Sequence, residues 1–292
     1  MEEPECPNCG AGSTRQVFRS VNAPGRIWIC NGCEFVFCFP LPLPASLSAG
    51  PHSIMTCEDY TAGLLSIPDS KQRLYDRLAD NRYERYSSTL KKRNFRLLEI
   101  GCGSCGLGSK YQQLGVEYHG IDLDPRVVEE ARRSGIRNVG CADFFDFSES
   151  ERFHVITFSQ VLEHIKEPRQ FMAKVHRMLL AHGVVHCDVP NHTSLPSLLY
   201  RLPLKGARWG AIEYPWHLFA YNRRSLRTLF EEFFAIEVFD ATVTDPIFGQ
   251  ATKMDSALAR IGPLLKLLRA GSLLVAYGIK KDICASAVSG SR

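Results

Sequence analysis

Short apolar runs alternate with longer amphipathic stretches from residue 95 onward. The apolar runs have the length of strands, and the segments between several of them carry helix start and stop signals. Strands that alternate with helices predict a mostly parallel sheet with helices on its faces, which is the doubly wound α/β class. The predicted strands are 96–100, 118–122, 138–141, 153–158, 184–189, 236–243 and 272–279.

Capping residues mark the predicted helices. Asp124 is a good N-cap, Pro125 suits the first helical position, and Gly135 is a typical helix end. The pattern therefore predicts a helix between residues 124 and 135. Three more helices are predicted over residues 68–90, from Pro168 to Gly183, and from a Ser225 cap to about residue 234.

The chain contains 11 cysteines, and four of them form two Cys-x-x-Cys pairs near the start. Twenty residues separate the pairs, which is the spacing of a zinc ribbon, with the metal held by Cys6, Cys9, Cys30 and Cys33. A closed site of four thiolates has no position for water, so the predicted Zn²⁺ is structural. A redox pair or an iron–sulfur centre is the alternative. A segment of about 40 residues buries little core, so the metal is expected to supply most of its folding free energy.

Composition and charge narrow the functional class. Hydrophobic residues make up 45% of the chain and charged residues 23%, and the net charge of +4 is only mildly basic. Nucleic acid is therefore an unlikely partner, because such proteins usually carry a concentrated basic face. The first five residues are acidic, and the apolar stretch 261–279 is interrupted by Lys266 and Arg269. These features predict a cytoplasmic protein without a membrane span.

A glycine-rich loop follows the strand predicted over residues 96–100. Gly101, Gly103 and Gly106 match Gly-x-Gly-x-x-Gly, and Asp122 ends the next strand, where a carboxylate can accept hydrogen bonds from a ribose diol. Alone, this pattern also fits a nicotinamide dinucleotide. Glu99 favours another nucleoside, because a carboxylate suits an ammonium and a sulfonium better than a pyrophosphate.

Two further segments fall at the predicted mouth of the sheet. Asp143 follows the third strand and could accept a hydrogen bond from an adenine amino group. Residues 159–165 mix polar and apolar side chains where the fourth strand ends. In open α/β sheets, ligands lie outside the carboxyl ends of the strands.

Together, residues 97–108, 118–125, 141–147 and 159–165 resemble the successive motifs of class I S-adenosylmethionine-dependent methyltransferases. The resemblance covers about residues 95–245 and implies a seven-stranded sheet whose last strand is antiparallel. It implies a methionine subsite at Glu99, Gly101 and Gly103, a ribose contact at Asp122, an adenine subsite at Leu123, Asp143 and Phe144, and a sulfonium side at Ser159 and Gln160.

The N-terminal arrangement is similar to that of bacterial methyltransferases that act on small molecules or sugars. In that group an aromatic residue equivalent to Tyr60 reaches the cofactor. The expected organisation is a ribbon and proline-rich connector over residues 1–45, a helical linker or lid over 46–92, and a methyltransferase domain over 93–292. A substrate-lid insertion is expected at about 191–222.

If the methylated atom is a hydroxyl oxygen or an acidic carbon, a base must remove its proton, and histidine is the usual base near neutral pH. His164 follows the fourth strand and His217 lies in the aromatic-rich insertion, while His192 is a weaker candidate. Each could instead be a structural, hydrogen-bonded histidine. A pocket for a ring-containing substrate, or alternatively the core of the lid, is suggested by Trp209, Tyr214, Trp216 and Phe219.

The sequence therefore predicts an enzyme that transfers a methyl group from S-adenosylmethionine to an oxygen or carbon of a small molecule, in secondary-metabolite or sugar biosynthesis. One alternative is an RNA methyltransferase that uses the ribbon to contact nucleic acid. The other is a module that binds zinc and cofactor without catalysis.

Overall fold

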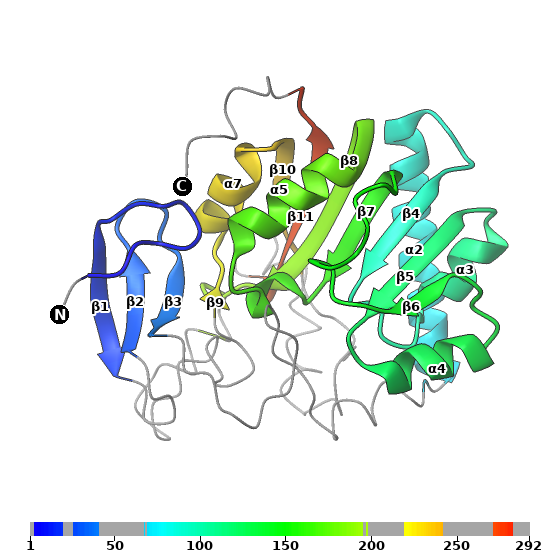
Figure 1. Cartoon of the computed structure of the whole chain (residues 1–292), viewed down its shortest axis with the longest axis horizontal. Coiled ribbons are helices and arrows are strands. Elements are labelled where there is room, and N and C mark those ends of the chain that lie inside the picture. Colours follow the sequence, from blue (N-terminus) through cyan, green and yellow to red (C-terminus); the bar gives the residue numbers. More distant parts are fainter. Residues whose placement is uncertain are drawn as a thin grey trace.

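The computed structural model describes residues 3–19, 26–40, 67, 69–194, 197, 219–241 and 271–282. Within these residues the chain forms a large seven-stranded sheet and a small four-stranded sheet beside it (Figure 1). None of the helices in these ranges combines the length and the apolar character needed to cross a membrane.

The large sheet has the strand order β10-β11-β8-β7-β4-β5-β6. Strand β11 runs antiparallel to both of its neighbours, and the remaining strands are parallel to one another. The predicted fold class is confirmed, including the antiparallel last strand. The strands are β4 (Arg96–Ile100), β5 (Glu117–Asp122), β6 (Val139–Cys141), β7 (Phe153–Ser159), β8 (Leu179–Pro190), β10 (Phe234–Ala241) and β11 (Leu273–Lys280).

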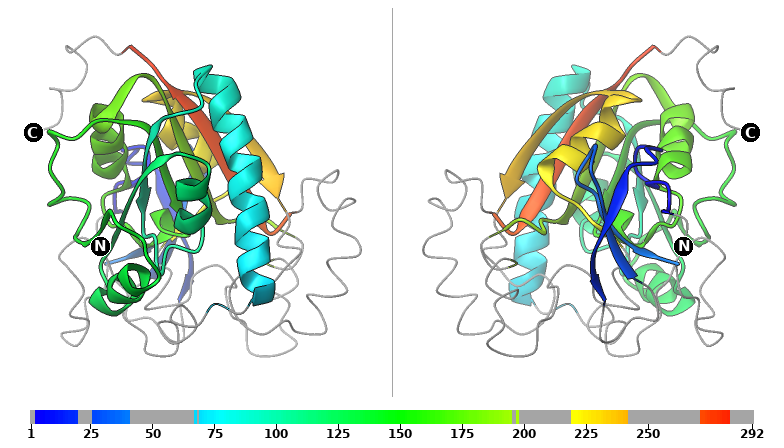
Figure 2. Two further views of the ribbon diagram at one scale, coloured as in Figure 1. Left: turned by 90° about the vertical axis from the view of Figure 1, so that its right-hand side faces the viewer. Right: turned by 90° about the vertical axis from the view of Figure 1, so that its left-hand side faces the viewer.

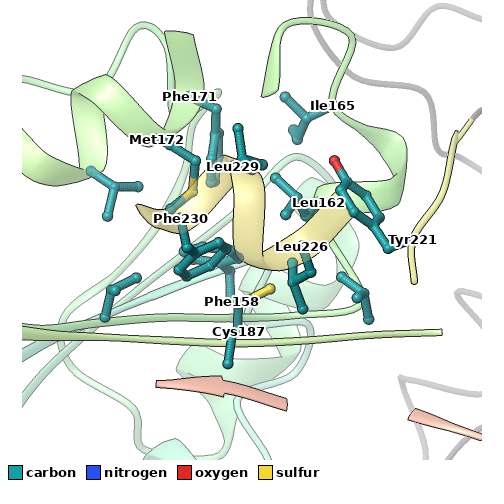
Figure 3. Close-up of a cluster of buried hydrophobic side chains, with 14 of the residues drawn as sticks. Phe158, Leu162, Ile165, Phe171, Met172, Cys187, Tyr221, Leu226, Leu229 and Phe230 are labelled. Carbon is teal, nitrogen blue, oxygen red and sulfur yellow. The ribbon is translucent and has the colours of Figure 1, made fainter. Parts of the chain in front are cut away.

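Helices cover both faces of this sheet, as the two side views in Figure 2 show. Successive strand residues point to opposite faces, so Leu97 of β4 packs with one set of helices and Leu98 with the other. The first set is α2 (Asp69–Leu90), α3 (Gly108–Gln113) and α4 (Pro125–Arg133); the second is α5 (Pro168–Met178) and α7 (Arg223–Glu231). Figure 3 shows the second core, where Phe158, Phe171 and Phe230 meet between α5, α7 and the sheet.

Two predicted helix boundaries are wrong. Helix α5 ends at Met178, and Gly183 lies inside β8 instead of closing the helix. A Cβ on Gly183 would lie 2.9 Å from the carbonyl oxygen of Leu180, so this glycine permits a close backbone approach within an irregular strand. The N-cap of α7 is Asn222; Ser225 is the third helical residue and completes a capping box.

The cap and stop of α4 are confirmed. The Asp124 carboxylate accepts a hydrogen bond from the backbone N–H of Arg126, Pro125 takes the first turn, and Gly135 has a φ of +86°. All three signals depend on neighbours in sequence, which explains why they could be predicted without knowledge of the tertiary fold.

The small sheet is built from two distant parts of the chain. Strands β1 (Thr14–Arg19), β2 (Arg26–Cys30) and β3 (Val36–Phe39) form an antiparallel meander, and β9 (Phe219–Ala220) adds a fourth strand beside β3. The cysteine segment is therefore completed by residues that follow the large sheet's fifth parallel strand in sequence.

The two sheets also share one hydrophobic core. The fully buried ring of Phe35 lies 5.3 Å from the ring of Phe219 and 4.7 Å from that of Tyr221, measured between ring centroids. Tyr221 in turn lies beside Leu162 under the edge of the large sheet (Figure 3). Packing against the large sheet therefore stabilises the ribbon alongside any metal, and the share of the folding free energy that the metal supplies stays a prediction.

We predict that Phe35→Ala lowers the free energy of unfolding of the whole chain by about 3–5 kcal/mol, as expected for loss of a buried ring. Urea unfolding should show one transition, shifted to lower urea, because the core is shared. Phe39→Ala is the matched control, since that ring is 44% exposed on the next strand and should have a small effect. Two separated transitions, of which only the smaller one moves, would contradict a shared core.

Candidate functional site

The carboxyl ends of β4, β5, β6, β7 and β8 lie along one edge of the large sheet, because these strands are parallel. The structure brings most of the predicted cofactor residues to it: Glu99, Gly101, Gly103, Asp122, Leu123, Asp143, Ser159 and Gln160.

The glycine loop after β4 turns sharply across the end of β5. Gly101 and Gly103 have φ values of +69° and +53°, a region that L-residues with a Cβ rarely adopt. The backbone N–H of Gly101 donates to the carbonyl of Ile121 at 2.8 Å, and that of Gly103 donates to Oδ2 of Asp122 at the same distance. The loop is therefore held against β5 with its backbone facing the edge.

Asp122 is fixed by two backbone donors. Its Oδ2 accepts from Gly103, and its Oδ1 accepts from the N–H of Asp124 at 2.9 Å. Each oxygen keeps a further lone pair, which is the arrangement that a ribose diol needs. Burial raises the pKa of Asp122, and the two backbone hydrogen bonds oppose that shift.

Glu99 is a buried carboxyl group of the edge, with 5% of its surface exposed. The hydroxyl of Tyr118 donates to its Oε2 at 2.6 Å. Burial raises the pKa of Glu99 to about 7, against the opposing effects of the Tyr118 hydrogen bond and the charge of Arg82. Glu99 thus changes charge near neutral pH, and a cation placed beside it would favour the ionised form.

Asp143 presents one satisfied and one unsatisfied oxygen. Its Oδ1 accepts from the N–H of Phe145 at 2.9 Å, whereas its buried Oδ2 has no hydrogen-bond partner within the described ranges. An unpaired buried acceptor fits a site for the adenine amino group. The ring of Phe144 packs against Phe171 of α5 at 4.8 Å, so its side chain belongs to the core and not to the edge.

Ser159 and Gln160 are tied to two residues that the sequence analysis did not single out. Ser159 Oγ donates to Oδ1 of Asp188 at 2.8 Å, and Arg82 Nη2 donates to the same oxygen at 2.8 Å. The sequence pattern could have indicated both residues. Asp188 is a charged residue within the apolar run of β8, and Arg82 lies at helical spacing from the buried Ala79 and Tyr86, on the same face of α2.

Of the two first-choice candidate bases, His164 and His217, the structure describes only His164. His164 is buried, with 7% exposure, in the short 3₁₀ helix Leu162–His164 after β7, next to Glu163, whose two carboxylate oxygens are buried without hydrogen-bond partners in the described structure. Burial raises the pKa of Glu163 to about 8. Phe219 lies in β9 and packs on Phe35, so its ring belongs to the core that the small sheet shares with the large one. Tyr60, Trp209, Tyr214, Trp216 and His217 lie outside the described residues.

The four N-terminal cysteines converge as predicted. The sulfur atoms of Cys6 and Cys33 are 3.7 Å apart, as are those of Cys9 and Cys30, and all four lie within 4.8 Å of one another. A tetrahedron of sulfurs about 2.3 Å from Zn²⁺ has edges of about 3.8 Å, so the cluster fits this metal. The contact between the two sulfurs lowers the pKa of Cys33 and raises the pKa of Cys6, so the pair shares one proton more readily than two.

Comparison with known proteins identifies the family. A family model described as a methyltransferase domain matches residues 70–233, more than half of the chain. The chain belongs to this methyltransferase family. The match includes α2, the glycine loop and the edge residues from Glu99 to Asp188.

Curated relatives and solved structures agree with this assignment. Ubiquinone biosynthesis O-methyltransferase of Cereibacter sphaeroides is 29% identical over 131 residues, which are 42% of this chain and 51% of that protein. The protein of the same name from Xanthomonas oryzae pv. oryzae is 26% identical over 132 residues, or 43% and 55%. The chain thus spans about half the length of these relatives.

The fold is also shared with the plantazolicin methyltransferase BpumL, solved in complex with a monoazolic desmethylPZN analog and SAH. The TM-score is 0.54 at 18% identity, covering 77% of this chain and 90% of that one. At this identity the likeness shows the fold alone. The predicted methyltransferase is confirmed at the level of family and fold.

We predict that the purified chain carries about one zinc ion, bound by the four clustered thiolates. Cobalt substitution should give a thiolate-to-cobalt charge-transfer band, because the ligands are sulfurs. Cys33→Ser should weaken the band and lower the thermal stability of the chain. Cys141→Ser is the control, since that thiol is exposed and remote from the cluster, and it should leave the metal content unchanged. An iron content in place of zinc would contradict the prediction.

Proposed function

We propose that this chain transfers a methyl group from S-adenosylmethionine to an oxygen or carbon of a small, ring-containing molecule. The observation that carries the proposal is the edge itself: a fixed glycine loop, an anchored Asp122 and the unpaired Oδ2 of Asp143, in a chain of the methyltransferase family. The name of the relatives, ubiquinone biosynthesis O-methyltransferase, supports oxygen as the acceptor atom. The ring-containing acceptor and the cytoplasmic location are predictions from the sequence.

Each edge residue has a separate part in this proposal. Glu99, Gly101 and Gly103 hold the methionine portion, Asp122 the ribose hydroxyls, and Leu123 and Asp143 the adenine. Ser159 and Gln160 face the sulfonium. Tyr60 contacts the cofactor and the backbone of Phe144 lies beside the adenine, as the family resemblance of the sequence implies. When bound, the cofactor supplies an electrophilic methyl carbon on a good leaving group, so the protein need only align the acceptor and exclude water.

Proton removal from the acceptor is assigned to a histidine. His164 lies at the edge but is buried inside the 3₁₀ helix, which fits a structural role as well as a catalytic one. We therefore keep His217, in the insertion, as the first candidate for the base and His164 as the second. Zn²⁺ at the four cysteines is proposed to be structural, since all four ligand positions are occupied by protein thiolates.

The first measurement is binding of S-adenosylmethionine, S-adenosylhomocysteine and NADH by calorimetry. We expect micromolar binding of the two sulfur nucleosides, weakened at least about tenfold by Asp122→Ala, because a carboxylate that bonds to hydroxyls is removed. Glu129→Ala, an exposed change on α4, is the control and should bind like the wild type. Binding of NADH instead would overturn the proposed function and leave the fold and the metal centre.

The pH dependence of binding tests the role of Glu99. The ligand's ammonium should prefer ionised Glu99, so affinity should rise with pH through the pKa of about 7. Between about pH 6 and about pH 8 the gain should approach tenfold, because the ionised fraction of Glu99 rises from about 0.1 to about 0.9. Glu99→Gln should bind more weakly and lose this dependence. A wild-type affinity that is flat across this range would contradict a contact between Glu99 and the ammonium.

A further inference from the structure

A buried ion pair crosses from α2 to the centre of the large sheet. Arg82 of α2 donates from Nη2 to Oδ1 of Asp188 in β8 at 2.8 Å, and the two side chains are 14% and 9% exposed. Charges this deeply buried need partners to offset the loss of hydration. The pair lies beside the edge where the cofactor is proposed to bind. This position suggests that the ion pair has a role in the site besides stabilising the fold.

Asp188 also fixes the end of the neighbouring strand. Its Oδ1 accepts from the hydroxyl of Ser159 at 2.8 Å, and that hydroxyl accepts from Arg82 Nη1 at 3.2 Å. The backbone carbonyl of Asp188 accepts from the N–H of Gln160 at 2.9 Å and from its side-chain amide at 3.3 Å. One residue of β8 therefore holds both residues that were assigned to the sulfonium side.

The conformation held in this way is a disfavoured one. Gln160 has a φ of +54°, in the left-handed region where a residue with a Cβ needs support from its surroundings. Val161, the next residue, packs on the glycine loop, because a Cβ on Gly101 would lie 2.5 Å from Cγ2 of Val161. Contacts thus run without a break from Asp188 through the turn at Gln160 to the backbone of Gly101.

We propose that Asp188, oriented by Arg82, is a positioning residue of the cofactor site. It holds the turn Ser159–Val161, and through it the Gly101 backbone, in the geometry that receives the methionine portion of S-adenosylmethionine. This inference rests on the proposed function. It assigns no contact between Asp188 and the reacting atoms.

The same pair acts on Glu99 through its charges. The positive charge of Arg82 lowers the pKa of Glu99, and the negative charge of Asp188 raises it. Neutralising Asp188 alone leaves the charge of Arg82 unopposed, so the pKa of Glu99 should fall. Neutralising both partners should largely cancel the change. Among the described residues, Glu99 also interacts electrostatically with Asp122 and Tyr118 on β5, Tyr75 on α2, Tyr111 on α3 and the Cys102 thiol in the glycine loop.

The test is the dissociation constant of S-adenosylhomocysteine, measured by calorimetry from about pH 5.5 to about pH 8 on the metal-loaded chain, a range that spans the Glu99 pKa. Asp188→Asn keeps the size of the side chain and removes its charge. We expect its dissociation constant to rise about tenfold, as for loss of a charge-assisted hydrogen bond, and the pH midpoint of binding to move lower. A purely structural residue would not move that midpoint.

The double variant Arg82→Gln with Asp188→Asn distinguishes the support that the ion pair gives to the turn from the effect of its charges on the pKa of Glu99. Its midpoint should return toward the wild-type value while its affinity stays weak, because the turn has lost its ionic support. Removal of both charges of a buried pair is tolerated better than removal of one, so the double variant keeps the test available if Asp188→Asn fails to fold.

Glu237→Gln is the matched control. It breaks the ion pair that Arg85, also on α2, makes with β10 at 2.6 Å, where the side chains are 39% and 68% exposed. We expect unchanged affinity and midpoint. Wild-type affinity, within about twofold, in Asp188→Asn or in the double variant would overturn the inference. Failure of the wild-type chain to bind S-adenosylhomocysteine would instead overturn the proposed function.

Discussion

A sheet that is covered on both faces accommodates polar side chains most easily where its strands end. In the central strands β4, β7 and β8, most side chains are buried, and a polar group there has to find a partner within the protein. At the carboxyl edge the parallel strands end side by side and the chain continues into loops. Carboxylates, amides and glycine turns are therefore found there together. The site exists because this edge is the one place where the fold tolerates so many polar groups.

This constraint also explains what could be predicted from the sequence. The glycine loop, the cap at Asp124 and the pairs of cysteines depend on neighbours a few residues apart, and the structure has them as predicted. Arg82 and Asp188 are separated by 106 positions, and only the packing of α2 on the sheet brings them together. Gly183 was misread partly for the same reason, because a Cβ there would approach the carbonyl oxygen of His154, a tertiary contact, as well as that of the nearby Leu180.

The four-cysteine segment is not an independent ribbon, because it is hydrogen-bonded to the large domain. Asn8, within the first cysteine pair, donates to the backbone carbonyl of Ser225 at 3.0 Å, and Glu34 accepts from Asn222 at 3.1 Å. Both partners belong to the capping box of α7. The four-cysteine segment therefore holds one end of a helix that covers the large sheet. Strand β9 then leads from the small sheet to Tyr221, which forms a β-bridge with Asn191 at the carboxyl edge.

The charges at the edge bear on the choice between the two nucleosides that the glycine loop could accept. Glu99 and Asp122 are both buried enough to have raised pKa values, and Asp143 adds an unpaired acceptor. The nearest buried cation, Arg82, is already engaged by Asp188. A pyrophosphate would bring two negative charges beside these carboxyl groups, and wherever they are ionised the repulsion would oppose binding. An ammonium and a sulfonium would instead stabilise the ionised carboxylates. The electrostatics of the edge therefore favour S-adenosylmethionine over a dinucleotide, although the backbone of the glycine loop would suit either.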